Sequence, residues 1–113
     1  MNVNERRKAI LEVLCARRHE TRENLAFEFG VSKRTIEYDV LSLSLEYPVY
    51  TSQGNGGGIH VVDGFKLEMK YLSDKQCSLL EKLAANLSGE DAEVMASIIK
   101  TFALPKKQEE KPI

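Results

Sequence analysis

The sequence predicts a mainly α-helical protein with one small β-hairpin. Helix caps and a glycine break divide the first 47 residues into three short helices, and two β-rich segments follow around a glycine-rich tip. Two amphipathic segments occupy the second half of the chain. A helix, a tight turn and a second helix followed by a hairpin form the element order of a winged helix-turn-helix. We therefore expect a winged helix-turn-helix followed by a C-terminal helical hairpin.

The first two helices are expected from their caps. Asn2 or Asn4 can cap a helix that continues through Arg18. The apolar face of this helix consists of Ile10, Leu11, Val13 and Leu14. Thr21 caps a short second helix, and Gly30 is the residue that ends it in a left-handed conformation.

The third helix opens at Ser32 and stops before Pro48. Its buried stripe is predicted at spacings i, i+4 and i+7, by Ile36, Val40 and Leu43. Residues 49–52 and 59–62 are then expected as strands joined through the glycine-rich segment 53–58.

The second half changes character after Gly64. Ser73 and Gln76 form the ends of a capping box, and leucines at helical spacing follow it. The segment 88–91 breaks this helix and starts another. We expect a winged domain at 1–65, a two-helix extension at 66–104 that serves packing or dimerisation, and a disordered tail at 105–113.

Charge argues against a general coating of nucleic acid. The sequence contains 16 Lys and Arg residues and 17 Asp and Glu residues, which gives a net charge of −1. Any affinity for nucleic acid must therefore come from local clustering. All six arginines lie within residues 1–62. Because the guanidinium fork suits phosphate and guanine, this half is interpreted as the binding half.

Other classes of protein find little support. Cys15 and Cys77 have no CxxC partner, and reduced buried thiols are the favoured interpretation. His19 and His60 lack metal-ligand spacing and are expected at the surface, with His60 a possible wing contact. No nucleophile stands beside a base, so an enzyme is not expected, and neither is a cofactor or small-molecule ligand. The sequence also shows no membrane span or signal peptide, which predicts a cytoplasmic protein.

One face of the third helix is the strongest functional candidate. At 100° per residue, Arg34, Tyr38 and Leu41 lie opposite the buried stripe. A helix in the major groove uses arginine for guanine and apolar groups for thymine methyls, while Lys33 and the helix N-terminus can meet phosphate. The alternative is a surface helix that touches a protein partner or a second subunit.

The glycine cluster fits neither G-x-G-x-x-G nor a phosphate loop, because Ile59 replaces the last glycine and no GK[ST] follows. Two compatible interpretations remain, a mobile hairpin tip and a wing lying along the DNA backbone.

Residues 5–65 resemble the helix-turn-helix domain of bacterial DeoR-like regulators, in the branch usually followed by a WYL domain. The resemblance rests on E-R-R-K-A-I-L, then T-x-x-x-L-A-x-x-F-G-V-S-x-R-T-I-x-x-D-V-x-x-L, then Y-P-V-Y-T-x-x-G-N-G-G-G-I. It implies sequence-specific binding of double-stranded DNA by a transcriptional regulator. The implied contacts are Ser32, Lys33, Arg34, Thr35 and Tyr38 in the groove, Thr21 and Arg22 on phosphate, and Asn55 and Gly57 in the wing.

The chain departs from the family in two ways. Family members often carry a basic residue where Tyr38 stands, and no WYL or effector domain follows residue 65. The two helices in that place could pack on the winged domain or join two copies into a homodimer, which we favour because a dimer contacts two half-sites. The rival to DNA binding is a protein-interaction module that docks a partner on Tyr38 and Leu41.

Overall fold

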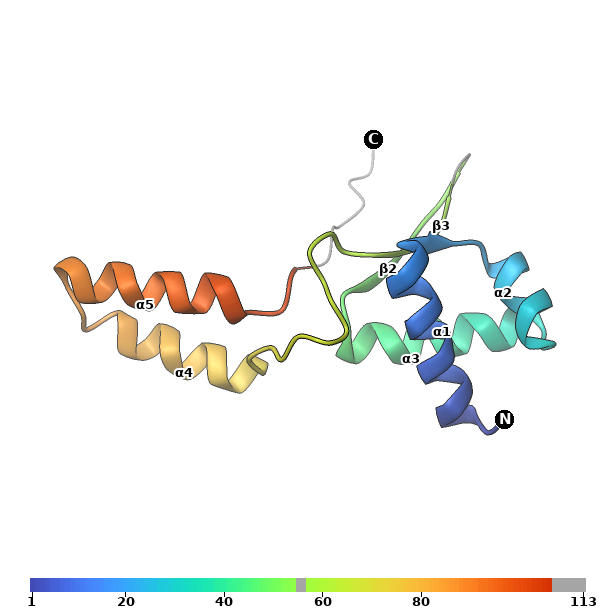
Figure 1. Cartoon of the computed structure of the whole chain (residues 1–113), viewed down its shortest axis with the longest axis horizontal. Coiled ribbons are helices and arrows are strands. Elements are labelled where there is room, and N and C mark those ends of the chain that lie inside the picture. Colours follow the sequence, from blue (N-terminus) through green and yellow to red (C-terminus); the bar gives the residue numbers. More distant parts are fainter. Residues whose placement is uncertain (55–56, 107–113) are drawn as a thin grey trace. The chain divides into compact units, whose positions relative to one another are not determined.

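A computed structural model describes residues 1–54 and 57–106. They form two compact units, one of Met1–Leu67 with residues 105–106 and one of Glu68–Leu104. The elements in chain order are α1 (Val3–Arg17), β1 (His19–Glu20), α2 (Arg22–Phe29), α3 (Lys33–Glu46), β2 (Val49–Ser52), β3 (Gly58–Val61), α4 (Asp74–Ala84) and α5 (Gly89–Phe102). This helical protein with a small antiparallel sheet confirms the predicted fold class, a winged helix followed by a helical hairpin (Figure 1).

The first unit has one apolar core, to which α1, α2, α3 and the sheet all contribute. Its most deeply buried side chains include Ile10, Leu14, Leu25, Ile36, Val49, Ile59, Val61 and Phe65. The predicted stripe of α3 is confirmed, since Ile36, Val40 and Leu43 are 0%, 4% and 6% exposed. Burial of this stripe fixes which side of α3 faces solvent.

The ends of the helices follow from local chemistry, as predicted. The side chains of Asn2, Thr21 and Ser32 each accept a hydrogen bond from the backbone N–H three residues later, which caps α1, α2 and α3. Gly30 ends α2 with a φ of 64°, a conformation that a residue without Cβ adopts at low cost. The tight turn between α2 and α3 is therefore set by Gly30 and Ser32.

The sheet has one strand more than the sequence indicates. Its order is β1-β3-β2, and all pairs are antiparallel. Strand β2 matches the predicted 49–52, whereas β3 begins and ends one residue before the predicted 59–62. Strand β1 has two residues, too few to show the alternation that identifies a strand in sequence.

The second unit is an antiparallel helical hairpin, in which α4 and α5 run side by side (Figure 1). Ser73 and Gln76 form the predicted capping box at the start of α4. At the open end of the hairpin, the Leu72 backbone N–H donates to the Phe102 carbonyl at 2.8 Å. Neither helix contains a buried residue.

Across the described residues, no helix combines the length and apolar character that crossing a bilayer requires. Of the tail predicted at 105–113, residues 107–113 lie outside the described residues.

Candidate nucleic-acid interface

The outward face of α3 carries Arg34, Tyr38 and Leu41, as the helical spacing predicts. Tyr38 is 54% exposed and Leu41 is 62% exposed. The Arg34 guanidinium carbon lies 5.5 Å from the centroid of the Tyr38 ring, and Arg34 Nε donates to the Tyr38 hydroxyl at 3.1 Å. Among the described residues Arg34 has no ion pair with a carboxylate. Its charge is therefore available to a ligand, and the tyrosine orients it.

The N-terminus of α3 adjoins this face. Ser32 Oγ accepts the backbone N–H of Thr35 at 3.1 Å and lies 3.0 Å from Thr35 Oγ1, so the two hydroxyls bond each other. The first amides of a helix have no intrahelical acceptor, and the helix dipole favours an anion beside them. Lys33 is the first residue of α3, and 60% of its side chain is exposed. The arrangement suits a phosphate group.

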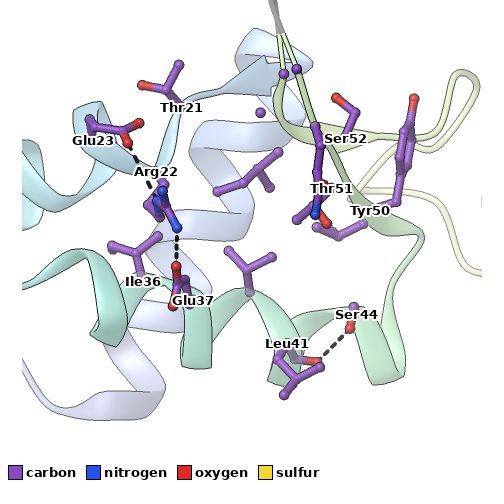
Figure 2. A pocket seen from close by; sticks show the side chains of 17 residues that line it. Thr21, Arg22, Glu23, Ile36, Glu37, Leu41, Ser44, Tyr50, Thr51 and Ser52 are labelled. Carbon is purple, nitrogen blue, oxygen red and sulfur yellow. Dashed lines mark hydrogen bonds and ion pairs between the residues drawn. The ribbon is translucent and has the colours of Figure 1, made fainter. Parts of the chain in front are cut away.

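Arg22 connects the N-terminus of α2 to α3 through ion pairs. Its Nη1 donates to the carboxylate of Glu37, and its Nε lies 3.5 Å from Glu23 (Figure 2). Glu23 also lies 3.8 Å from the Lys33 ammonium. The pKa of Glu23 is lowered, first by its own backbone N–H and then by the charges of Arg22 and Lys33. Two carboxylates thus balance two cations at this site.

A hollow of about 990 Å³ lies between the start of α2, the middle of α3 and strands β2 and β3 (Figure 2). Ile36 and Val40 line it from α3, and Ile59 lines it from β3. The remaining lining groups are mostly polar side chains and the backbone of the glycine-rich hairpin. The predicted residues Thr21, Arg22, Leu41 and Gly57 all line this hollow, which is open to solvent between the helices and the wing.

Steric constraints in the hairpin turn explain why glycine occupies positions 54 and 57 of the wing. A Cβ on Gly57 would lie 2.8 Å from the carbonyl oxygens of both Gly54 and Ser52. The Gly57 amide donates to the Gly54 carbonyl at 2.9 Å, and Gly54 has a φ of 90°. Turn geometry therefore accounts for Gly54 and Gly57. Asn55, the other predicted wing contact, lies outside the described residues.

The prediction of His60 as a surface histidine needs correction. His60 occupies the central strand β3, where its half-buried ring stacks between Tyr50 and His19, with centroids at 5.1 Å and 5.6 Å. Its Nε2 lies 2.7 Å from Ser52 Oγ. These contacts follow from the register, in which His60 pairs with both His19 and Tyr50. In residues 1–54 and 57–106, no group of three or more potential metal ligands occurs.

Acidification is expected to destabilise the sheet through His60. Burial, followed by the charge of His19, lowers the pKa of His60 below 6.5. The unfolded chain therefore binds more protons than the folded chain once the pH falls below about 6.5, and stability decreases there. We expect Tm to fall between pH 7.5 and 5.5, and His60→Gln to reduce this fall. Thermal unfolding measures both; an equal fall in the variant would contradict the prediction.

Most arginines of the first half of the chain have structural partners within the fold. Arg6 and Arg7 of α1 bind one carboxylate, Asp39, which α3 holds at 1% exposure. Arg6 donates to it through Nε at 2.6 Å and Nη2 at 3.0 Å, and Arg7 donates through Nε at 2.9 Å. Arg7 also donates to Ser42 Oγ at 3.0 Å. This cluster joins α1 to α3 inside the fold.

Two further arginines have structural partners. Arg17 pairs with Glu20 and Glu28. Arg18, which adopts a φ of 71°, donates to the carbonyls of Val62 and Phe65 at 2.9 Å each. Among the described residues, Arg34 is thus the arginine that has neither a carboxylate nor a backbone carbonyl as partner. Its exposure on α3 is a better indication of a DNA contact than the number of arginines in the sequence.

Comparison with known proteins supports a helix-turn-helix regulator in general terms. Over 73 residues the chain is 34% identical to "Uncharacterized HTH-type transcriptional regulator YobV" of Bacillus subtilis (strain 168). The match covers 64% of this chain and 23% of that protein, so the chain spans about a quarter of its relative's length. No family model matches the chain, and no solved structure does.

Proposed function

We propose that this protein binds double-stranded DNA in a sequence-specific manner and regulates transcription. The observation that carries the proposal is that Arg34, Tyr38 and Leu41 form an exposed face on a helix whose opposite side is buried in the core. The similarity to an HTH-type transcriptional regulator supports the same function. The finer assignment to DeoR-like, WYL-associated regulators rests on the sequence motifs. A bacterial transcriptional regulator of this kind would act in the cytoplasm.

In this proposal α3 lies in the major groove. Arg34 donates to O6 and N7 of a guanine, while Leu41 contacts a thymine methyl group. Tyr38 holds the Arg34 guanidinium and occupies the position where a basic residue would otherwise contact DNA. Lys33 and the first amides of α3, with the hydroxyls of Ser32 and Thr35, meet a backbone phosphate.

The hollow beside α3 would receive the neighbouring DNA strand. Thr21 and Arg22 contact phosphate from the start of α2, and the wing, with Asn55, Gly57 and the strand bearing His60, contacts it from the other side. Because Arg22 is paired with Glu37, phosphate must compete for its guanidinium. Exchange of a carboxylate for a phosphate keeps the charge-assisted bonds but limits the gain in affinity.

A second candidate function is docking of a protein on the same face. Its support is apolar exposure: Leu45 is 81% exposed, and with Val3, Tyr38 and Leu41 it lines a hollow of about 490 Å³ between α1 and α3.

We also propose a homodimer through the C-terminal helices. A single winged module buries only about 600–1,000 Å² of its surface on DNA, and a dimer would contact two half-sites.

Titration of labelled duplex DNA at several salt concentrations separates the two functions. Contacts with phosphate release counterions, so the DNA-binding protein is expected to lose affinity steeply as salt increases. Selection from a random duplex pool should first supply the bound sequence. Lys33→Ala is expected to weaken all duplexes alike and to lower the salt slope by about one unit. Weak binding without sequence preference at low salt would instead favour the protein partner.

A further inference from the structure

A carboxylate, Glu37, lies on the side of α3 that faces the hollow beside the wing. Its side chain is 51% exposed, and it lines the hollow together with Leu41 of α3 and Arg22 of α2 (Figure 2). At 100° per residue, Glu37 lies about 40° from Leu41 and about 60° from Arg34 around the helix axis. It therefore belongs to the proposed DNA-binding face, although its charge repels phosphate.

In the free protein, Arg22 neutralises Glu37. The Arg22 guanidinium donates through Nη1 to the Glu37 carboxylate, and this hydrogen bond is the first cause that raises the pKa of Arg22. Arg22 is also the side chain proposed to bind phosphate from the start of α2. A phosphate that binds Arg22 takes the counter-charge away from Glu37, and DNA covers the carboxylate at the same time. Glu37 then needs another hydrogen-bond donor, because an unpaired carboxylate excluded from water is costly.

The bases of DNA differ in whether they supply that donor. At its major-groove edge cytosine presents the N4 amino group, whereas guanine presents the acceptors N7 and O6 and thymine presents the acceptor O4. Adenine has an amino group at N6, but the acceptor N7 stands beside it. An ionised carboxylate only accepts hydrogen bonds, so it is attracted to cytosine and repelled by the edges that carry acceptors.

We propose that Glu37 selects a cytosine in the bound DNA by accepting a hydrogen bond from its N4 amino group while phosphate takes over Arg22. This role rests on the proposed function, because it requires α3 to lie in the major groove. On a site without this cytosine, one contact is lost in either of two ways. Glu37 keeps Arg22 and the phosphate contact is lost, or phosphate takes Arg22 and Glu37 is left without a donor. Arg22 and Glu37 thus make a phosphate contact, which all sequences offer, depend on one base.

Helix geometry places this cytosine close to the guanine proposed for Arg34. Side chains three residues apart on a helix have Cβ atoms about 5–6 Å apart, and successive bases of one strand are about 3.4 Å apart along the DNA axis. Glu37 is therefore expected to contact a base pair one or two steps from that guanine. The Arg34 contact is bidentate and holds α3 in register, so Arg34→Ala removes both preferences, whereas a change at Glu37 affects only the cytosine.

Selection of bound sequences from a random duplex pool, performed with the wild-type chain and with Glu37→Gln, tests this role. The wild-type chain is expected to prefer cytosine about tenfold at one position, within two base pairs of a selected guanine. A glutamine amide both donates and accepts, and it pairs with N6 and N7 of adenine. Glu37→Gln is therefore expected to change the preferred base at this position from cytosine to adenine and to keep the guanine.

Glu23→Gln is the matched control. Glu23 is 52% exposed, lies 3.5 Å from Arg22 Nε and carries the same charge as Glu37, but it belongs to α2. Neutralising it frees the same guanidinium for phosphate, so Glu23→Gln is expected to strengthen binding to all duplexes severalfold without a change in the preferred bases. Circular dichroism checks that both variants keep their helices.

Fluorescence anisotropy with four duplexes, one for each base at the selected position, measures the ratios. If Glu37→Gln strengthens binding to all four alike and keeps the wild-type preference, as Glu23→Gln should, Glu37 acts only through the charge of Arg22. That result, or a wild-type chain that selects guanine without a nearby cytosine, overturns cytosine selection and leaves DNA binding intact. If the wild-type chain selects no sequence at all, both cytosine selection and the proposed function are overturned.

Discussion

Replacing Asp39 with Asn is expected to cost about 3 kcal/mol of folding stability, which corresponds to a decrease in Tm of more than 10 °C. Asp39 is 1% exposed and accepts three hydrogen bonds from Arg6 and Arg7. An amide would leave both guanidiniums without their counter-charge at the junction of α1 and α3. The figure is at the low end for a broken buried pair, because the Arg6 and Arg7 side chains keep 15% and 31% exposure.

The same variant should change the response to acid. Burial opposes ionisation of Asp39, but hydrogen bonds from Arg6 and Arg7 outweigh it, and the pKa of Asp39 is lowered from 3.8. A carboxyl with a lowered pKa adds stability above pH 3.8 that disappears as the pH falls through its folded value. Urea unfolding from pH 7 to pH 3 should therefore show a smaller loss in Asp39→Asn. Glu46→Gln, an exposed acid at the end of α3, is the control and should stay within about 0.5 kcal/mol.

The sequence predicts the parts of this fold that depend on neighbouring residues. Thr21 and Ser32 cap the helices that they precede, and Gly30 breaks the chain between them, because each acts within three or four residues. The outward direction of Tyr38 and Leu41 is equally predictable, since helical spacing fixes it once the buried stripe is known.

Contacts between residues distant in sequence are harder to predict. Arg6 and Asp39 lie 33 positions apart, and no local pattern joins them. A signal was nevertheless present: Asp39 falls beside Ile36 and Val40 on the buried side of α3, and a carboxylate there requires a cation. The ring contacts of His60 were missed for a similar reason, because its stacking on His19 depends on the short strand β1.

The candidate site shows the same division. Exposure on α3 follows from periodicity, whereas the pairing of Arg22 with Glu37 depends on how α2 crosses α3. Counting arginines in the sequence overstated the charge available to a ligand, since structural partners bind most of them. Arg34 is therefore the arginine that we propose to select the DNA sequence.

Arg34→Ala is expected to remove sequence preference and to weaken binding to the selected duplex by about 10- to 100-fold, the value of one bidentate contact with guanine. Affinity for an unrelated duplex should decrease much less, because the phosphate contacts of Lys33 and the α3 N-terminus remain. Arg34→Lys keeps the charge and loses the planar fork, so it should retain non-specific affinity without restoring preference.

Tyr38→Phe provides the finer comparison, since it removes the hydroxyl that accepts from Arg34 Nε and keeps the ring beneath the guanidinium. If the tyrosine orients Arg34 mainly through that bond, preference should decrease by a smaller factor than in Arg34→Ala, on the order of the 0.5–1.5 kcal/mol of one hydrogen bond. Fluorescence anisotropy with matched and unrelated duplexes measures both ratios. Retention of full preference by Arg34→Ala would show that another side chain of α3 selects the sequence, and would leave Arg34 a phosphate contact at most.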